Sequence, residues 1–144
     1  MIIRKFKASD RQSLIDLWSE VFPDDPAHNE PSSVITAKLA VDDLIFVAQQ
    51  DNGLDNELDN KLIGACMAGY DGHRGWLYAV AVLPQQRRSG TGAALVKHAI
   101  QSLKDIGCMK VNLQIRSTNT QVAAFYKALG FAVEDRMSMG VFIE

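Results

Sequence analysis

The residues best suited to chemistry lie in one stretch, where an apolar run typical of a strand leads into a glycine-bearing turn and then a helix: Val80-Ala81-Val82-Leu83-Pro84-Gln85-Gln86-Arg87-Arg88-Ser89-Gly90-Thr91-Gly92-Ala93-Ala94-Leu95. Glycines let the backbone approach a ligand closely, and the first N–H groups of a helix have no partner within it. With the helix dipole, such N–H groups form an anion site suited to a pyrophosphate. Arg87 and Arg88 add positive charge. A purely structural strand-to-helix turn is the alternative interpretation.

Two familiar phosphate-binding motifs do not fit this turn. A dinucleotide-binding turn has a third glycine and an acidic residue about 20 positions further on. Here Leu95 stands at the third glycine position, and residues 110–115 contain no carboxylate. No Gly-Lys-Ser/Thr follows, so the P-loop pattern is also absent. Binding of a nicotinamide dinucleotide is therefore only a distant alternative.

The rest of the pattern predicts a mixed sheet that would position this turn. Ser9 and Gln12 have the spacing of a capping box, which predicts a helix beginning there. Helices are expected at about 9–21, 31–41, 91–106 and 119–129, and strands at 2–6, 44–48, 62–70, 75–82, 109–115, 131–133 and 139–143. Strands and helices mix without strict alternation, which favours a mixed α/β fold. We expect one domain over residues 1–144, with a single sheet of six to seven strands and four helices on both faces.

Residues 51–62 repeat the pattern Asp-Asn-x-Leu three times. Asp, Asn and Gly favour turns, so the repeat is interpreted as an expanded hairpin loop. The pattern lacks the alternating oxygen ligands and closing glutamate of an EF-hand calcium loop. We assign it no chemistry.

Composition argues against several function classes. The 144 residues carry 15 Lys and Arg against 17 Asp and Glu, a net charge of -2 that gives no support for nucleic-acid binding. Cys66 and Cys108 stand far apart with no histidine pair nearby, which argues against a metal site or redox motif. No apolar stretch approaches the roughly 20 residues of a membrane helix. We expect a cytoplasmic protein that binds neither metal, membrane nor nucleic acid.

Two motifs, in order and on the expected elements, carry a resemblance to a known family. Arg87-x-x-Gly90-x-Gly92 resembles the Arg/Gln-x-x-Gly-x-Gly/Ala motif of the Gcn5-related N-acetyltransferases, the GNAT superfamily. The block Asn119-Thr120-Gln121-Val122-Ala123-Ala124-Phe125-Tyr126-Lys127-Ala128-Leu129-Gly130-Phe131 is similar to that family's Asn-…-Phe-Tyr-x-x-x-Gly-Phe block. The order of elements resembles the family over essentially the whole chain, and residues 69–75 look like a stretch found in a largely uncharacterised bacterial branch.

The resemblance implies an acetyl-CoA-dependent N-acetyltransferase that acts by direct attack in a ternary complex. It implies that the turn holds the pyrophosphate of acetyl-CoA, through Arg87, Arg88, Ser89, Gly90, Thr91, Gly92 and Ala93. The pantetheine arm would pair with Val80 to Val82, with the N–H of Val82 at the thioester carbonyl. Asn119 would contact the pantetheine arm, although its position also suits a helix N-cap. Tyr126 would protonate the departing thiolate.

The sequence departs from the family in one place that matters for chemistry. Many members carry a glutamate on the strand before the turn, and residues 76–79 contain no carboxylate. The general base is therefore unassigned, with Asp71, Tyr70, Tyr78 or solvent as candidates. A catalytically weak acyl-CoA-binding regulator or sensor is the alternative function.

The resemblance also implies where an acceptor amine would bind. The candidate contacts are Trp18, Asn29 in the loop 23–30, Tyr70, Asp71 and Tyr78. The acceptor would be a small molecule or a peptide amine, and the protein a monomer or homodimer.

Overall fold

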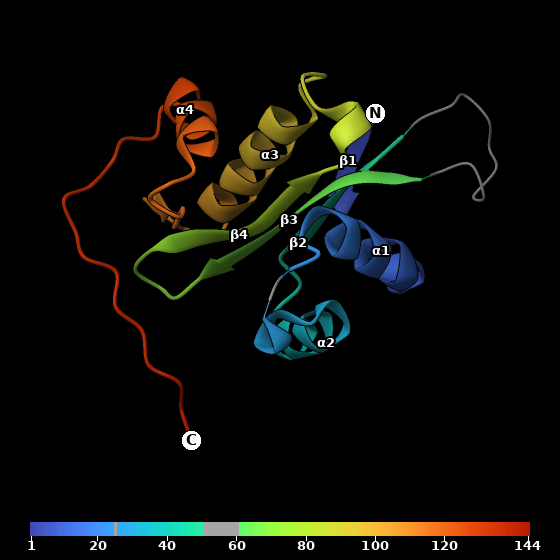
Figure 1. The fold of residues 1–144 in the computed structure, drawn as a ribbon, viewed down its shortest axis with the longest axis horizontal. Helices are drawn as coiled ribbons and strands as arrows, with labels where there is room; N and C mark the ends of the chain where they lie inside the picture. The colour runs from blue at the N-terminus through green and yellow to red at the C-terminus, as the bar shows by residue number, and fades with distance from the viewer. Residues whose placement is uncertain (25, 51–60) are drawn as a thin grey trace. The chain divides into compact units, whose positions relative to one another are not determined.

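A computed structural model describes residues 1–24, 26–50 and 61–144 (Figure 1). These residues form two compact units, Met1–Leu113 and Gln114–Glu144, and each is described by itself. The Asp-Asn-x-Leu repeat falls outside the described residues except for Lys61 and Leu62. The expectation of a single domain stays a prediction.

The first unit contains one mixed sheet in the order β1-β2-β3-β4-β5. Its strands are β1 (Ile2–Lys5), β2 (Ile45–Gln49), β3 (Leu62–Tyr70), β4 (Gly75–Val82) and β5 (Val111–Asn112). The first four pair antiparallel with their neighbours, and β5 pairs parallel with β4. The mixed α/β class is confirmed, whereas the expected number of strands was wrong, because the described residues form five.

Helices cover both faces of this sheet (Figure 1). α3 (Thr91–Asp105) packs on one face, and α1 (Arg11–Val21) packs on the other, with α2 (Pro31–Val41) against α1. Every residue of β2 is buried. This burial on both faces explains why β2 is apolar at each position from Ile45 to Ala48 instead of alternating.

Three expected local features differ in the structure. The first helix begins at Arg11, after a 3-10 turn at Ala8–Asp10, and Ser9 makes no capping contact within the described residues. The strand expected at 109–115 is limited to the two residues of β5. Residues 131–133 and 139–143 form no strand within Gln114–Glu144, whose described helix is α4 (Thr120–Ala128). An apolar pattern favours a strand, but a strand also requires a partner for its backbone groups, and the pattern does not supply one.

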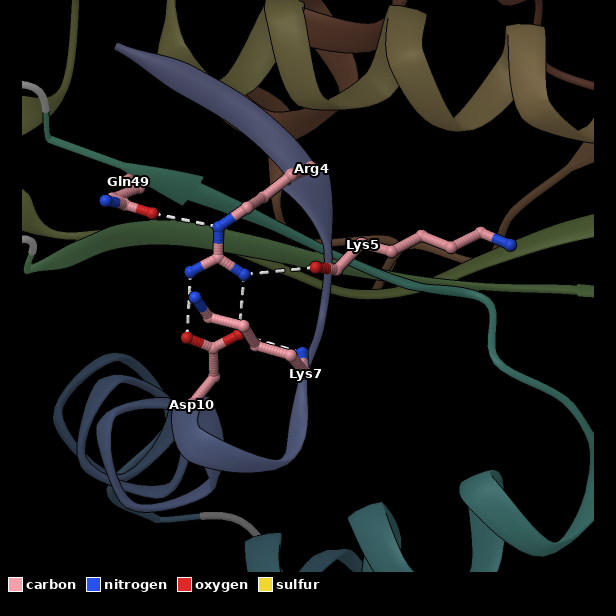
Figure 2. Close-up of polar contacts among 5 residues, drawn as sticks. All are labelled: Arg4, Lys5, Lys7, Asp10 and Gln49. Atoms are coloured by element: carbon pink, nitrogen blue, oxygen red, sulfur yellow. Dashed lines mark hydrogen bonds and ion pairs between the residues drawn. The ribbon is translucent and has the colours of Figure 1, made fainter.

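A polar cluster ties the edge strand β1 to the start of α1 (Figure 2). The Arg4 guanidinium makes two hydrogen bonds to the Asp10 carboxylate, at 2.7 and 2.9 Å, and donates through Nε to Oε1 of Gln49 at 2.8 Å. The backbone N–H of Lys7 donates to Asp10 at 2.9 Å. Asp10 is buried, so its charge depends on these partners.

Asp10 is held in its ionised form by this cluster. Burial alone would raise the pKa of its carboxyl group, but hydrogen bonds from Arg4 and the Lys7 N–H, with the positive charges nearby, bring the pKa below its ordinary value. A lowered folded-state pKa contributes stability that is fully present above the unfolded-state pKa and is lost as the pH falls through the folded-state value.

We therefore predict that Asp10→Asn lowers the free energy of unfolding by about 1–3 kcal/mol at neutral pH, because Arg4 loses its charged partner. The difference from wild type should shrink as the pH falls below about 4, where Asp10 begins to protonate in the unfolded chain, and disappear once the folded carboxylate is protonated as well. Urea unfolding at several pH values measures this. Asp43→Asn is the matched control, since its ion pair with Lys5 is exposed and should contribute less than about 1 kcal/mol. Equal losses in the two variants would contradict the assignment.

Candidate functional site

The turn between β4 and α3 presents a row of backbone N–H groups. Two of its residues, Arg88 (φ +67°) and Gly90 (φ +84°), have positive φ angles. Gly90 is the N-cap of α3 and supplies no side chain to cap it. The first helical bond runs from the Ala94 N–H to the Gly90 carbonyl at 3.0 Å. Within the described parts of the chain, no group accepts a hydrogen bond from the backbone N–H groups of residues 88–93.

Side-chain hydroxyls hold the shape of this turn. The Ser89 hydroxyl donates to the Gln86 carbonyl, which leaves the Ser89 oxygen to accept from the Thr91 hydroxyl at 2.8 Å. Thr91 is only 2% exposed. Thus the hydroxyls bond to each other and to the chain before the turn, and the backbone N–H groups stay available for a ligand.

The first turn of α3 packs very closely on β3 at Gly64. A Cβ atom on Gly64 would lie 2.9 Å from Cδ1 of Leu95, 3.0 Å from the carbonyl oxygen of Ala81 and 3.2 Å from Cγ2 of Thr91. These distances leave no room for a side chain. Gly64 therefore sets how near the N–H row lies to the sheet.

One extra residue interrupts the pairing of β4 with β3. Met67 pairs with Tyr78, but Ala65 pairs with Ala81, so Ala79 and Val80 together stand opposite Cys66. This is a β-bulge. Ala79 has a φ of +48°, which costs a residue other than glycine roughly 1–2 kcal/mol.

A buried tryptophan holds the bulge. The indole Nε1–H of Trp18, on α1, donates to the Ala79 carbonyl oxygen at 3.1 Å. Trp18 is 3% exposed. Leaving this buried donor and acceptor unpaired would cost about 1–3 kcal/mol, which is comparable with the backbone strain at Ala79. The contact is therefore large enough to maintain the bulge.

The bulge determines which N–H groups of β4 point to its outer edge, the side of β4 that faces away from β3. The Gly75 N–H donates to Lys110 on the β5 side at 2.9 Å, whereas the Leu83 N–H donates to Ile63 on the β3 side at 2.9 Å. These positions are an even number apart and would face the same side in a regular strand. Because the extra residue reverses the alternation, the N–H groups of Val82 and Val80 face away from β3.

That outer edge is open beyond Trp76. β5 pairs only with Gly75 and Trp76. Among the described residues of the first unit, no strand pairs with this edge from Leu77 to Val82. The edge can therefore accept an extended ligand as though it were another strand, directly before the turn that carries the N–H row.

The second unit positions Asn119 and Tyr126 on α4. The Asn119 side chain accepts a hydrogen bond from the Val122 N–H at 3.2 Å, so the N-cap interpretation is confirmed. Its contact with a cofactor stays a prediction. Tyr126 is 7% exposed, with its ring edge-on to Phe125 and Phe131 at centroid distances of 4.9 and 5.4 Å.

A helix-ending motif fixes the Tyr126 ring. The Phe131 N–H donates to the Tyr126 carbonyl and the Gly130 N–H to that of Lys127, both at 3.0 Å. Gly130 has a φ of +97°. These are the two bonds of a Schellman motif, which brings Phe131 back against Tyr126.

One of the residues predicted to contact an acceptor lines a cavity. Asn29 lines a cavity of about 210 Å³ near the end of α1, together with Ser19, Phe22, Pro23, Pro26, Ala27, Glu30 and Pro31. Trp18, Tyr70, Asp71 and Tyr78 are not among the lining residues. Sequence reasoning missed Ser19 and Phe22, whereas Glu30 belongs to the loop 23–30 that it had named; the cluster of prolines in this loop was the available signal.

Tyr70 and Asp71 lie at the β3–β4 hairpin. The Tyr70 hydroxyl is 3.3 Å from the carbonyl oxygens of Gly72 and Gly107. The Asp71 carboxylate accepts from the backbone N–H groups of His73 and Arg74, at 2.8 and 2.7 Å. Its local role is thus to close the turn.

Two of the candidate bases, Asp71 and Tyr78, have shifted pKa values, and so does Glu30 in the cavity near the end of α1. Hydrogen bonds from the Arg74 and His73 backbones lower the pKa of Asp71, which makes it a weaker base. Partial burial and the Asp71 charge raise the pKa of Tyr78, which keeps its hydroxyl protonated. Hydrogen bonds from Ser33 and Ser32 lower the pKa of Glu30. At neutral pH Asp71 and Glu30 are therefore ionised but weaker bases than ordinary carboxylates, and Tyr78 is a neutral phenol.

The described residues contain no group of three or more His, Cys, Asp or Glu side chains placed to hold a metal ion. They also contain no helix long and apolar enough to cross a membrane.

Known proteins resemble this chain in sequence and in fold. The model of the Acetyltransferase (GNAT) family matches residues 11–131. An acetyltransferase of Yersinia pestis is 33% identical over 140 residues, covering 97% of this chain and 94% of the relative. The acetyltransferase SG1711 of Sodalis glossinidius is 35% identical over 136 residues, covering 94% and 89%. A solved structure of AAC(6′)-Iy with the bisubstrate analogue CoA-S-monomethyl-acetylneamine has a TM-score of 0.77 at 19% identity and covers 99% and 97% of the two chains.

The chain therefore belongs to the GNAT family of acetyltransferases. It is an acetyl-CoA-dependent N-acetyltransferase, as the two sequence motifs implied.

We predict that Gly64→Ala destabilises the fold by about 1–3 kcal/mol, because the new methyl group overlaps Leu95 and the Ala81 carbonyl. It should also weaken acetyl-CoA binding, since the first turn of α3 must move away from the sheet. Urea unfolding and calorimetric titration measure the two effects. Gly69→Ala on the same strand is the control, because its Cβ would meet Tyr78 and Lys38 at an ordinary 3.6 and 3.7 Å. The interpretation fails if the two variants behave alike.

Proposed function

We propose that this chain moves the acetyl group of acetyl-CoA to a primary amine by direct attack in a ternary complex. The observation that carries the proposal is the row of N–H groups at residues 88–93, which have no acceptor within the described chain, directly after the open edge of β4. These groups fit the cofactor chemically, because a diphosphate needs several converging donors and an amide-containing arm pairs with a strand edge. A fold neighbour in complex with a CoA-containing analogue adds support.

The turn residues Arg87 to Ala93 bind the diphosphate, and the guanidinium groups of Arg87 and Arg88 add charge. Val80 and Val82 pair with the pantetheine arm through their backbones. The Val82 N–H donates to the thioester oxygen, which gains negative charge as the amine attacks. Losing one such donor typically costs about 10²–10³-fold in rate.

Asn119 and Tyr126 complete the proposed machinery. The Asn119 amide NH2 contacts the pantetheine arm while its oxygen caps α4. Acetyl-CoA supplies an electrophilic carbonyl carbon and a thiolate leaving group. Tyr126 gives its hydroxyl proton to that thiolate as the carbon–sulfur bond breaks, and it regains a proton from solvent. Solvent takes the proton that the amine loses, because residues 76–79 carry no carboxylate that could act as the base on this strand.

The acceptor is a small-molecule or peptide amine that enters near the end of α1. The cavity there combines apolar walls from Phe22, Pro23 and Pro31 with the polar groups of Asn29 and Glu30. Direct contact of the acceptor with Trp18, Asn29, Tyr70, Asp71 or Tyr78 stays a prediction. The monomeric or dimeric state and the cytoplasmic location stay predictions as well.

One observation favours a second candidate, an acyl-CoA-binding regulator or sensor with weak catalysis. Residues 76–79 carry no carboxylate, and the pKa values of Asp71 and Glu30 are lowered. Release of free thiol from acetyl-CoA across a panel of amines separates the two, because a sensor binds without turnover. Thermal shifts with acetyl-CoA present identify the acceptor, since a bound amine stabilises the folded state. NADH serves as the negative control for binding.

Ala93→Pro tests the backbone donors directly. Proline is tolerated in the first turn of a helix but has no N–H, so it removes one donor from the row. We expect about 10–100-fold weaker acetyl-CoA binding, the equivalent of one charge-assisted hydrogen bond, with little loss of stability. Ala93→Ser keeps the N–H and should change the binding free energy by no more than about 0.5 kcal/mol. Titration calorimetry measures both, and unaltered binding by the proline variant would remove this amide from the site.

Tyr126→Phe tests the general acid. The variant keeps the ring that packs against Phe125 and Phe131 and loses only the hydroxyl. We expect turnover to fall by about 10²–10⁴-fold, with acetyl-CoA affinity nearly unchanged. Thiol-release kinetics and titration give the two numbers, and the melting temperature checks folding. Unchanged turnover would take Tyr126 out of the mechanism.

A further inference from the structure

We propose that Trp18 is a positioning residue for acetyl transfer: its indole N–H fixes the bulge in β4 and thereby directs the Val82 N–H to the open edge. The inference rests on the proposed function, because it concerns the same thioester-binding edge. Trp18 acts through the backbone of β4 and needs no contact with either substrate.

The contact pairs a buried hydrogen-bond donor, the Trp18 indole N–H, with a backbone acceptor, the Ala79 carbonyl. A buried indole N–H requires an acceptor, and Trp18 is buried in α1. A bulge leaves one residue outside the ladder, and here the Ala79 carbonyl accepts from Trp18 at 3.1 Å. The two residues are 61 positions apart in the chain. The bond therefore ties the helix on one face of the sheet to the point where the alternation of β4 reverses.

The direction in which the Val82 N–H points depends on the bulge in β4. With the bulge, Leu83 donates to Ile63 and Val82 faces outward. Without it, alternation from Gly75 would turn the Ala81 N–H outward and the Val82 N–H toward β3. Ala79 has no intrinsic preference for its φ of +48°, as glycine would have, so the bulge needs an external contact to persist.

The substitution Trp18→Phe removes the indole N–H and keeps an aromatic ring in the core. Leu14→Val is the matched control, because Leu14 is fully buried on the same helix and its aliphatic side chain cannot hydrogen-bond. A role limited to core packing would give both variants the same phenotype at equal stability. Ala79→Gly is the third variant, since glycine adopts a positive φ without needing the bond from Trp18.

Nuclear magnetic resonance of the full chain, labelled with ¹⁵N, tests the inference. In the ligand-free protein, cross-strand contacts of Ala65 with Ala81 and of Met67 with Tyr78 report the bulged register. The Val82 amide shift with acetyl-CoA, minus its shift with CoA, reports the bond to the thioester oxygen. We expect Trp18→Phe to lose the Ala65–Ala81 contact and most of the Val82 difference, and Leu14→Val to keep both.

A double-mutant cycle makes the test independent of overall stability. In the Ala79→Gly background, Trp18→Phe should leave the Val82 response nearly intact, because glycine retains the bulge by itself. Thiol-release kinetics, with whichever amine of the panel gives turnover, should show kcat reduced by about 10–100-fold in Trp18→Phe and mostly restored in the double variant, with KM for acetyl-CoA within about threefold of wild type.

The outcomes distinguish this inference from the proposed function. If wild type shows no Val82 difference between acetyl-CoA and CoA, the proposed thioester contact fails. If wild type shows the difference and Trp18→Phe keeps it, or loses it equally in both Ala79 backgrounds, the positioning role of Trp18 is overturned and the proposed function stands.

Discussion

The alternation of N–H groups along β4 is the constraint on which the site depends. A regular strand presents every second N–H to a given neighbour, so one edge cannot pair with β5 at Gly75 and still offer Val82 farther on. The extra residue at Ala79–Val80 resolves this conflict within one strand. The first half of β4 then pairs with β5, while the second half of β4 presents an open edge just before the glycine turn.

The turn and the edge are organised by different forces. The N–H row at residues 88–93 follows from the start of α3 and from hydroxyls that bond among themselves. The edge follows from packing, since α1 brings Trp18 to Ala79 and Gly64 lets α3 approach β3. Both rest on a sheet whose edge strand β1 is held to α1 by Arg4 and Asp10. Rigid elements thus hold donor groups that need not reorganise when a ligand arrives.

The electrostatics of the site favour binding and leaving-group chemistry over strong base chemistry. The pKa values of Asp71 and Glu30 are lowered by hydrogen bonds that close a turn and cap a helix. The arginines of the turn add charge where a diphosphate would lie. The cavity beside the end of α1 is lined half by proline and phenylalanine and half by Ser19, Ala27, Asn29 and Glu30.

The sequence alone determined the features that depend on neighbouring residues. The strands 62–70 and 75–82, the helix 31–41 and the glycine turn before α3 all follow from patterns a few residues long. The tertiary structure decided the rest. Ser9 was expected to cap the first helix, but Asp10 beside it instead accepts hydrogen bonds from Arg4. Asp71, a candidate base, closes a turn. Residues 131–133 lack the strand partner that their pattern predicts. The bulge and its bond to Trp18 could not be read in advance, because β-ladder register is set by contacts between residues far apart in the chain, and no local pattern encodes them.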